Sequence, residues 1–141
     1  MYQLTYVATE RLAIIRFSGK MKGAEAQVAT VEAAQRSVGQ LRKVFWDFRD
    51  VTQADLTDSD GALVKLNASR IAATGVDLTQ LEVVFVTTPG NSAVNDVIYE
   101  RLRLGNVHTS QVGVTLSDIA ERPVRGALLA LGLPTDFELP Y

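Results

Sequence analysis

The chain has 141 residues, of which 47% are hydrophobic and 21% charged, and its formal net charge at pH 7 is −2. This length and composition are typical of one globular domain, which we expect to span residues 1–141. The absence of cysteine excludes disulfides, thiolate catalysis and cysteine-ligated zinc. The scattered basic residues argue against nucleic-acid binding, which depends on neutralising phosphates.

The first residues lack the basic and apolar segments of a signal peptide. Nor does any apolar run approach the ~20 residues that a bilayer span requires. We therefore expect a cytoplasmic protein with no membrane span.

Two strands are predicted at the start of the chain. Residues 2–6 alternate between apolar and polar side chains, which is typical of a half-buried strand. Residues 12–17 are apolar except for Arg16 and predict a second strand that ends at Ser18 and Gly19. A turn at residues 10–11 would pair the two strands as a hairpin.

Helices and strands alternate through the rest of the chain. Helical spacing of apolar residues predicts helices over about 24–38, 59–74, 92–104 and 117–132. Short apolar runs predict buried strands over 44–48, 81–86 and 112–116, with a polar connection over 49–58. Because proline is costly inside a helix, the last helix either starts late or kinks at Pro123.

The predicted fold is therefore α/β, with a mixed five-stranded sheet in the element order β-β-α-β-α-β-α-β-α and helices covering the sheet. A C-terminal tail of about residues 135–141 carries Phe137, Leu139 and Tyr141. These apolar side chains could pack on their own domain or on a partner subunit, so either a monomer or a homodimer is compatible with the sequence.

Acidic residues gather after the third predicted strand. They are Asp47, Asp50, Asp55, Asp58 and Asp60, and ligands of open α/β sheets bind near the carboxyl ends of strands. Carboxylates could hold Mg²⁺ or Ca²⁺. The spacing does not match an EF-hand loop, however, and a solvated acidic loop is the commoner case. We therefore expect no metal and no cofactor.

The segment Thr57-Asp58-Ser59-Asp60 has two interpretations. Thr57 and Asp60 have the spacing of a capping box, and Asp58 and Asp60 favour the positive end of a helix dipole. On this interpretation the segment serves only to start the second helix. Alternatively, Ser59 is an exposed phosphorylation site whose added charge switches a protein interface.

No set of residues indicates an enzyme. His108 is the only histidine and lacks a second ligand or a nucleophile beside it. The loops that follow strands contain neither of the glycine-rich nucleotide-binding motifs. Asp47 could be the phosphoacceptor of a receiver-like domain, but the acidic pair and the lysine that such a domain needs are missing.

The order of certain residues resembles the STAS-like superfamily, which includes SpoIIAA-like proteins. The resemblance rests on Phe17-Ser18-Gly19-Lys20, Trp46-Asp47-Phe48, Asp58-Ser59-Asp60-Gly61 and Leu131-Gly132-Leu133. In anti-sigma-factor antagonists of this superfamily a partner kinase phosphorylates a serine in an Asp-Ser-Ser-Gly segment. The resemblance implies that Ser59 corresponds to this serine. Asp60 replaces the second serine, and the connection from Asp47 to Asp58 looks longer, which favours the SpoIIAA-like branch.

These observations lead to two hypotheses. The first is a non-enzymatic regulatory module that binds a protein partner, a kinase or a regulator, through Thr57–Asp60 and Asp47. The second is a domain of the same fold that binds a small apolar or lipid-like ligand, since the SpoIIAA-like branch has been related to lipid-binding Sec14-type domains.

Overall fold

The computed structural model describes residues 1–55, 61–86, 96, 113–117 and 123–141. In chain order its elements are β1 (Tyr2–Val7), β2 (Leu12–Lys22), α1 (Gly23–Arg36), β3 (Lys43–Asp55), α2 (Gly61–Ala73), β4 (Glu82–Val86), β5 (Gly113–Ser117) and α4 (Pro123–Ala130). Short 3-10 turns occupy Ala8–Glu10 and Leu78–Gln80.

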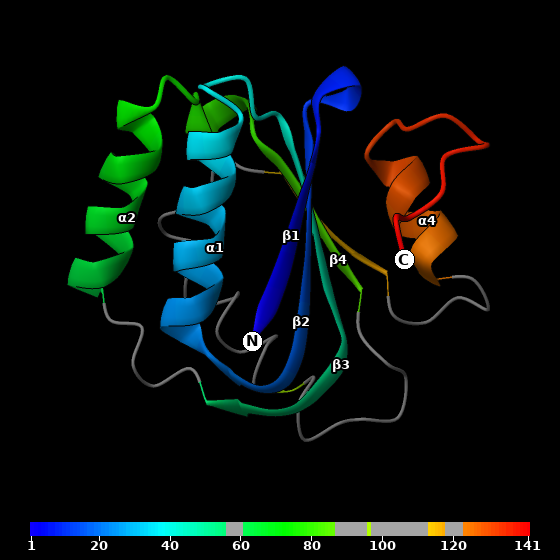
Figure 1. The fold of residues 1–141 in the computed structure, drawn as a ribbon, viewed down its shortest axis with the longest axis horizontal. Coiled ribbons are helices and arrows are strands. Elements are labelled where there is room, and N and C mark those ends of the chain that lie inside the picture. The colour runs from blue at the N-terminus through cyan, green and yellow to red at the C-terminus, as the bar shows by residue number, and fades with distance from the viewer. Residues whose placement is uncertain (56–60, 87–95, 97–112, 118–122) are drawn as a thin grey trace.

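The strands form one mixed sheet in the spatial order β1-β2-β3-β4-β5. β1 is antiparallel to β2, and the three other neighbouring pairs are parallel. α1 and α2 lie on one face of the sheet, and α4 lies on the other (Figure 1). The predicted α/β class, with helices covering a mixed sheet, is confirmed.

Two of the predicted helices lie partly or almost wholly outside the described residues. The helix predicted over 92–104 lies, apart from Asp96, outside the described residues, so the full element order stays a prediction. α4 has Pro123 as its first described residue. Proline suits the first turn of a helix, because the N–H that it lacks would have no partner there.

Each face of the sheet carries its own apolar core, because successive side chains of a strand point to opposite faces. On the side of α1 and α2 the core contains, among others, Ala13, Ile15, Phe17, Val44, Phe48, Val83 and Phe85. On the side of α4 it contains Leu12, Ile14, Phe45, Val84, Val86, Ala127, Leu128, Leu131 and Leu133. We call the second group the α4-side core.

β2 and β3 are longer than predicted. The sequence predicted that they end at Gly19 and Phe48, but they continue to Lys22 and Asp55 and pair with each other over this extension. Residues 49–55 therefore form strand rather than the predicted connection. Within the extension Met21 and Val51 are buried in the core on the side of α1 and α2, while the polar residues around them are held by backbone pairing. The register shifts twice within this pairing, as at β-bulges, which bend a strand and increase its twist.

α1 ends two residues earlier than the predicted Val38. The Ser37 hydroxyl donates to the Ala34 carbonyl at 2.8 Å and accepts from the Leu41 backbone N–H at 3.0 Å. This side chain bonds the backbone on both sides of the helix end, and so turns the chain toward β3. Val38 then adopts a left-handed conformation with φ 51°.

Among the helices that the structure describes, none combines the length and the apolar character needed to cross a bilayer.

Candidate functional site

Of the five predicted site residues, the structure describes one. Thr57, Asp58, Ser59 and Asp60 lie outside the described residues, which stop at Asp55 in β3 and resume at Gly61 in α2. Their predicted role therefore stays a prediction. Asp47 lies in β3 and is the residue around which polar contacts gather.

Asp47 sits on the α4 side of the sheet, in phase with Phe45 of the α4-side core. It pairs with Arg16 of β2 and with Val86, the last residue of β4. Its exposed fraction is 1%, and it is the one charged side chain buried among the described residues. A carboxylate in this position is costly unless it is paired and hydrogen-bonded.

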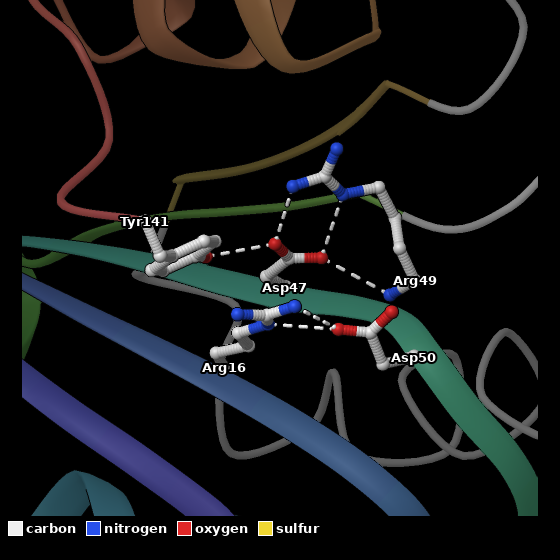
Figure 2. A network of polar contacts seen from close by, with 5 residues as sticks. All are labelled: Arg16, Asp47, Arg49, Asp50 and Tyr141. Carbon is white, nitrogen blue, oxygen red and sulfur yellow. Dashed lines mark hydrogen bonds and ion pairs between the residues drawn. The ribbon is translucent and has the colours of Figure 1, made fainter.

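Arg49 and Tyr141 provide the partners of this carboxylate (Figure 2). Arg49 donates through Nε to Oδ1 at 2.9 Å, through Nη2 to Oδ2 at 2.7 Å and through its backbone N–H to Oδ1 at 3.0 Å. The Tyr141 hydroxyl donates to Oδ2 at 2.7 Å. Each carboxylate oxygen thus accepts two hydrogen bonds from the chain itself.

These contacts determine the protonation states. Burial disfavours the carboxylate and acts to raise the pKa of Asp47, but the hydrogen bonds from Arg49 and Tyr141 outweigh it, so the pKa is lowered. Burial and the hydrogen bond to Asp47 raise the pKa of the Tyr141 hydroxyl. At neutral pH, Asp47 is therefore ionised and Tyr141 is a protonated donor.

Arg16 connects the site to a second ion pair. Its Nε and Nη2 lie 2.7 and 2.6 Å from Oδ2 of Asp50, and its guanidinium carbon lies 4.4 Å from the centroid of the Tyr141 ring. A guanidinium over an aromatic face is attracted by the ring quadrupole. Tyr141 is thus held by its hydroxyl and by its ring (Figure 2). We call Arg16, Asp47, Arg49, Asp50 and Tyr141 the Asp47 network.

The segment Pro134–Tyr141 carries Tyr141 to this network, and we call it the strap. Nη1 of Arg125 in α4 donates to the carbonyls of Thr135 at 2.9 Å and Phe137 at 3.1 Å. Phe137 and Leu139 are half-buried against the α4-side core. The predicted tail therefore packs on its own domain, which was one of the two alternatives left by the sequence.

The geometry bears on the chemistry of Asp47. A general base or a phosphoacceptor needs a carboxylate oxygen that can reach its substrate, whereas both oxygens of Asp47 are engaged by Arg49 and Tyr141. Within the described part of the chain, no group of three or more His, Cys, Asp or Glu side chains is placed to hold a metal ion. Through Tyr141, the Asp47 network holds the strap against the sheet.

Sequence reasoning listed Asp50 in the same acidic group as Asp47 and placed Tyr141 in the tail. It did not bring Arg16, Arg49, Asp50 and Tyr141 together around Asp47. The alternation of side chains could have found two of them. Arg16 is in phase with Leu12 and Ile14 of the same strand, and Tyr141 is in phase with Phe137 and Leu139. Asp50 could not be placed in this way, because a register shift separates it from Asp47.

Comparison with known proteins assigns no family. No protein-family model matches the chain, and the comparison with curated proteins finds no significant match. Function is therefore inferred from the residues and their geometry.

Proposed function

We propose that this protein is a non-enzymatic regulatory module of STAS-like or SpoIIAA-like architecture, acting in the cytoplasm through contacts with a protein partner. The observation that carries the proposal is that the buried carboxylate of Asp47 is saturated by donors from its own chain. A buried charge that is fully satisfied internally serves structure and recognition better than catalysis.

The sheet supports the architectural part of the proposal. An antiparallel edge strand β1 is followed by parallel strands in sequential order, with α1 and α2 together on one face. This is compatible with the element order that the resemblance implies.

The proposed switch is Ser59, flanked by Asp58 and Asp60. Ser59 is two residues before Gly61, the first residue of α2, and four after Asp55, the last of β3. A phosphate near a helix N-terminus gains from the dipole and is opposed by neighbouring carboxylates. α2 is itself anchored on α1, because the Asn67 side-chain amide donates to Gln27 Oε1 at 2.6 Å. A charge added at Ser59 would then alter a surface without altering the fold.

The test compares Ser59→Ala, Ser59→Asp and a matched control, Ser69→Asp, which adds the same charge at an exposed position farther along α2. Each variant is immobilised and exposed to extract from the host, and the retained proteins are quantified by mass spectrometry. We expect one partner to be retained by the Ser59→Ala and Ser69→Asp variants and to fall about tenfold with Ser59→Asp, at unchanged melting temperature. Equal retention by Ser59→Ala and Ser59→Asp would refute the switch.

A further inference from the structure

The strap is bound to the domain as a peptide would be. Pro134–Tyr141 contains neither helix nor strand, and its hydrogen bonds to the rest of the described chain come from side chains: Arg125 donates to two of its carbonyls, and its own Tyr141 hydroxyl donates to Asp47. Phe137 and Leu139 add apolar contacts, and the Tyr141 ring lies against the Arg16 guanidinium. Contacts of this kind can be reproduced by a segment that is not part of the chain.

The surface beneath the strap is an apolar face with a polar end. α4 lies over β4 and β5, and the strap returns from α4 toward the sheet (Figure 1). Leu12, Ile14 and Phe45 of β2 and β3 belong to the core against which Phe137 and Leu139 pack. Beyond these apolar residues, Asp47 and Arg16 mark the end of the surface. We call it the strap site.

The strap contacts this surface through every second residue. Phe137, Leu139 and Tyr141 contact the domain, while Glu138 and Pro140 between them are exposed. A period of two is that of an extended chain, and Pro140 favours an extended conformation at Leu139. The strap site therefore accommodates an aromatic residue, an aliphatic residue and a tyrosine at every second position.

The polar end supplies specificity. Asp47 is buried and accepts from a hydroxyl, and the Arg16 guanidinium lies against the ring of the same residue. Burying a carboxylate is not needed to hold an apolar segment and costs desolvation. A segment with phenylalanine at the position of Tyr141 has no hydroxyl to donate to Asp47. The buried carboxylate then loses a hydrogen bond, so such a segment binds more weakly.

We propose that the strap site is a peptide-docking site that the chain fills with its own strap, and that an extended segment of a partner protein, with the pattern aromatic-x-aliphatic-x-tyrosine, replaces it. Tyr141 is 44% exposed, so a competing segment can reach the polar end of the site. The site lies on the face opposite α1 and α2 and is independent of the proposed switch at Ser59.

The test uses the full chain and a labelled, amidated synthetic peptide of residues 134–141. Because a tethered segment competes at an effective concentration of about 1 mM, the wild-type chain should bind the peptide weakly. Tyr141→Ala weakens the tether and should tighten peptide binding about tenfold, since a hydrogen bond to a charged group is worth roughly that factor. Binding is measured by fluorescence anisotropy.

Two controls separate docking from nonspecific adhesion. Leu129→Ala removes an exposed apolar side chain of α4 outside the strap and should leave peptide binding as in the wild type. A peptide with phenylalanine at its last position should bind the Tyr141→Ala chain about tenfold more weakly than the tyrosine peptide. Ser59→Asp should not change either affinity.

Three outcomes would overturn the proposal. The first is that the Tyr141→Ala chain, shown by circular dichroism to be folded, binds the peptide no more tightly than the wild type does. The second is that the Tyr141→Ala chain binds the tyrosine peptide and the phenylalanine peptide with equal affinity. Finally, the wild-type chain could dimerise with rising concentration while Tyr141→Ala stays monomeric, which would assign the strap site to the strap of a second copy.

Discussion

At the scale of single residues, Asp47 shows how a buried charge is retained. It lies between two apolar neighbours of the sheet, Phe45 on its own strand and Val86 on the next. Arg49 can serve as its partner because two residues along a strand bring side chains back to the same face. Pairing from within the same strand makes the ion pair independent of how the strands are aligned.

Replacement of this carboxylate should be costly and dependent on pH. We expect Asp47→Asn to lower the free energy of unfolding by about 2 kcal/mol at pH 7, because Arg49 and Tyr141 lose a charged acceptor. Since the pKa of Asp47 is lowered in the folded chain, its contribution is present above the ordinary aspartate range and is lost as the pH falls through the folded value. Urea unfolding at pH 7 and pH 2 should show the wild type and the variant converging in acid.

Asp50→Asn is the matched control for this experiment. Asp50 is exposed, and its partner is Arg16 at the surface, so its loss should cost less than about 1 kcal/mol. An effect as large as that of Asp47→Asn would mean that burial does not distinguish the two carboxylates.

Val38 is a strained residue that the fold tolerates. It is β-branched, has a φ of 51° and is 80% exposed, so packing does not explain its presence. Val38→Asn should raise the free energy of unfolding by about 1 kcal/mol, because asparagine adopts this conformation more readily. Urea unfolding measures this gain in the free energy of unfolding, and Val38→Ala should give a smaller gain than Val38→Asn. A loss of stability in Val38→Asn would show that the valine is held by contacts not evident in its exposure.

At the scale of elements, the close approach of two connections fixes how α1 and α2 sit together. Gly39, in the loop between α1 and β3, faces the backbone at the end of α2. A Cβ at this position would lie 2.4 Å from the Thr74 carbonyl oxygen, and φ is +80°. The glycine is thus required by space and by conformation.

A pair of glycine variants separates these two requirements. Gly39→Ala should lower the free energy of unfolding by about 3 kcal/mol, since the backbone at Thr74 must shift in addition to the conformational strain. Gly132→Ala has a similar φ of +69° and no atom within 4 Å of its Cβ, so it should cost only about 1 kcal/mol. Thermal or urea unfolding of both chains tests the difference, and equal costs would contradict the proposed close contact.

At the scale of the whole molecule, apolar patterning was enough to predict the class and most of the elements. The runs at 12–17, 44–48 and 81–86 are buried strands because both faces of the sheet are covered, and this burial is what makes them continuous in sequence. The extension of β2 and β3 was missed because its buried residues, Met21 and Val51, stand singly among polar residues and form neither a continuous nor an alternating apolar pattern. The Asp47 network was hidden for a related reason: its members come from three segments, and their meeting depends on the path of the strap.

The stability of the molecule should also fall at high pH. The Tyr2 hydroxyl of β1 donates to Glu32 of α1, and this hydrogen bond raises the pKa of Tyr2 from 10.0 to about 12. Because the folded value is the higher one, the contribution is complete below pH 10 and is lost as the pH rises toward 12. The raised pKa of Tyr141 acts in the same direction.

Melting temperatures measured between pH 8 and 11.5 should therefore decline less steeply for Tyr2→Phe than for the wild type. If Tyr2→Phe gives the same slope as the wild type, the contact between β1 and α1 does not govern the alkaline transition.

The position of the strap along the chain has a consequence for biosynthesis. A ribosome delivers the chain from its N-terminus at about 5–20 residues per second, so β2 and β3 emerge well before Pro123–Tyr141. Leu12, Ile14 and Phe45 then remain uncovered while α1 already shields the opposite face. The nascent sheet is therefore one-sided for several seconds, and its open side is a natural target for chaperones and for premature association between neighbouring chains.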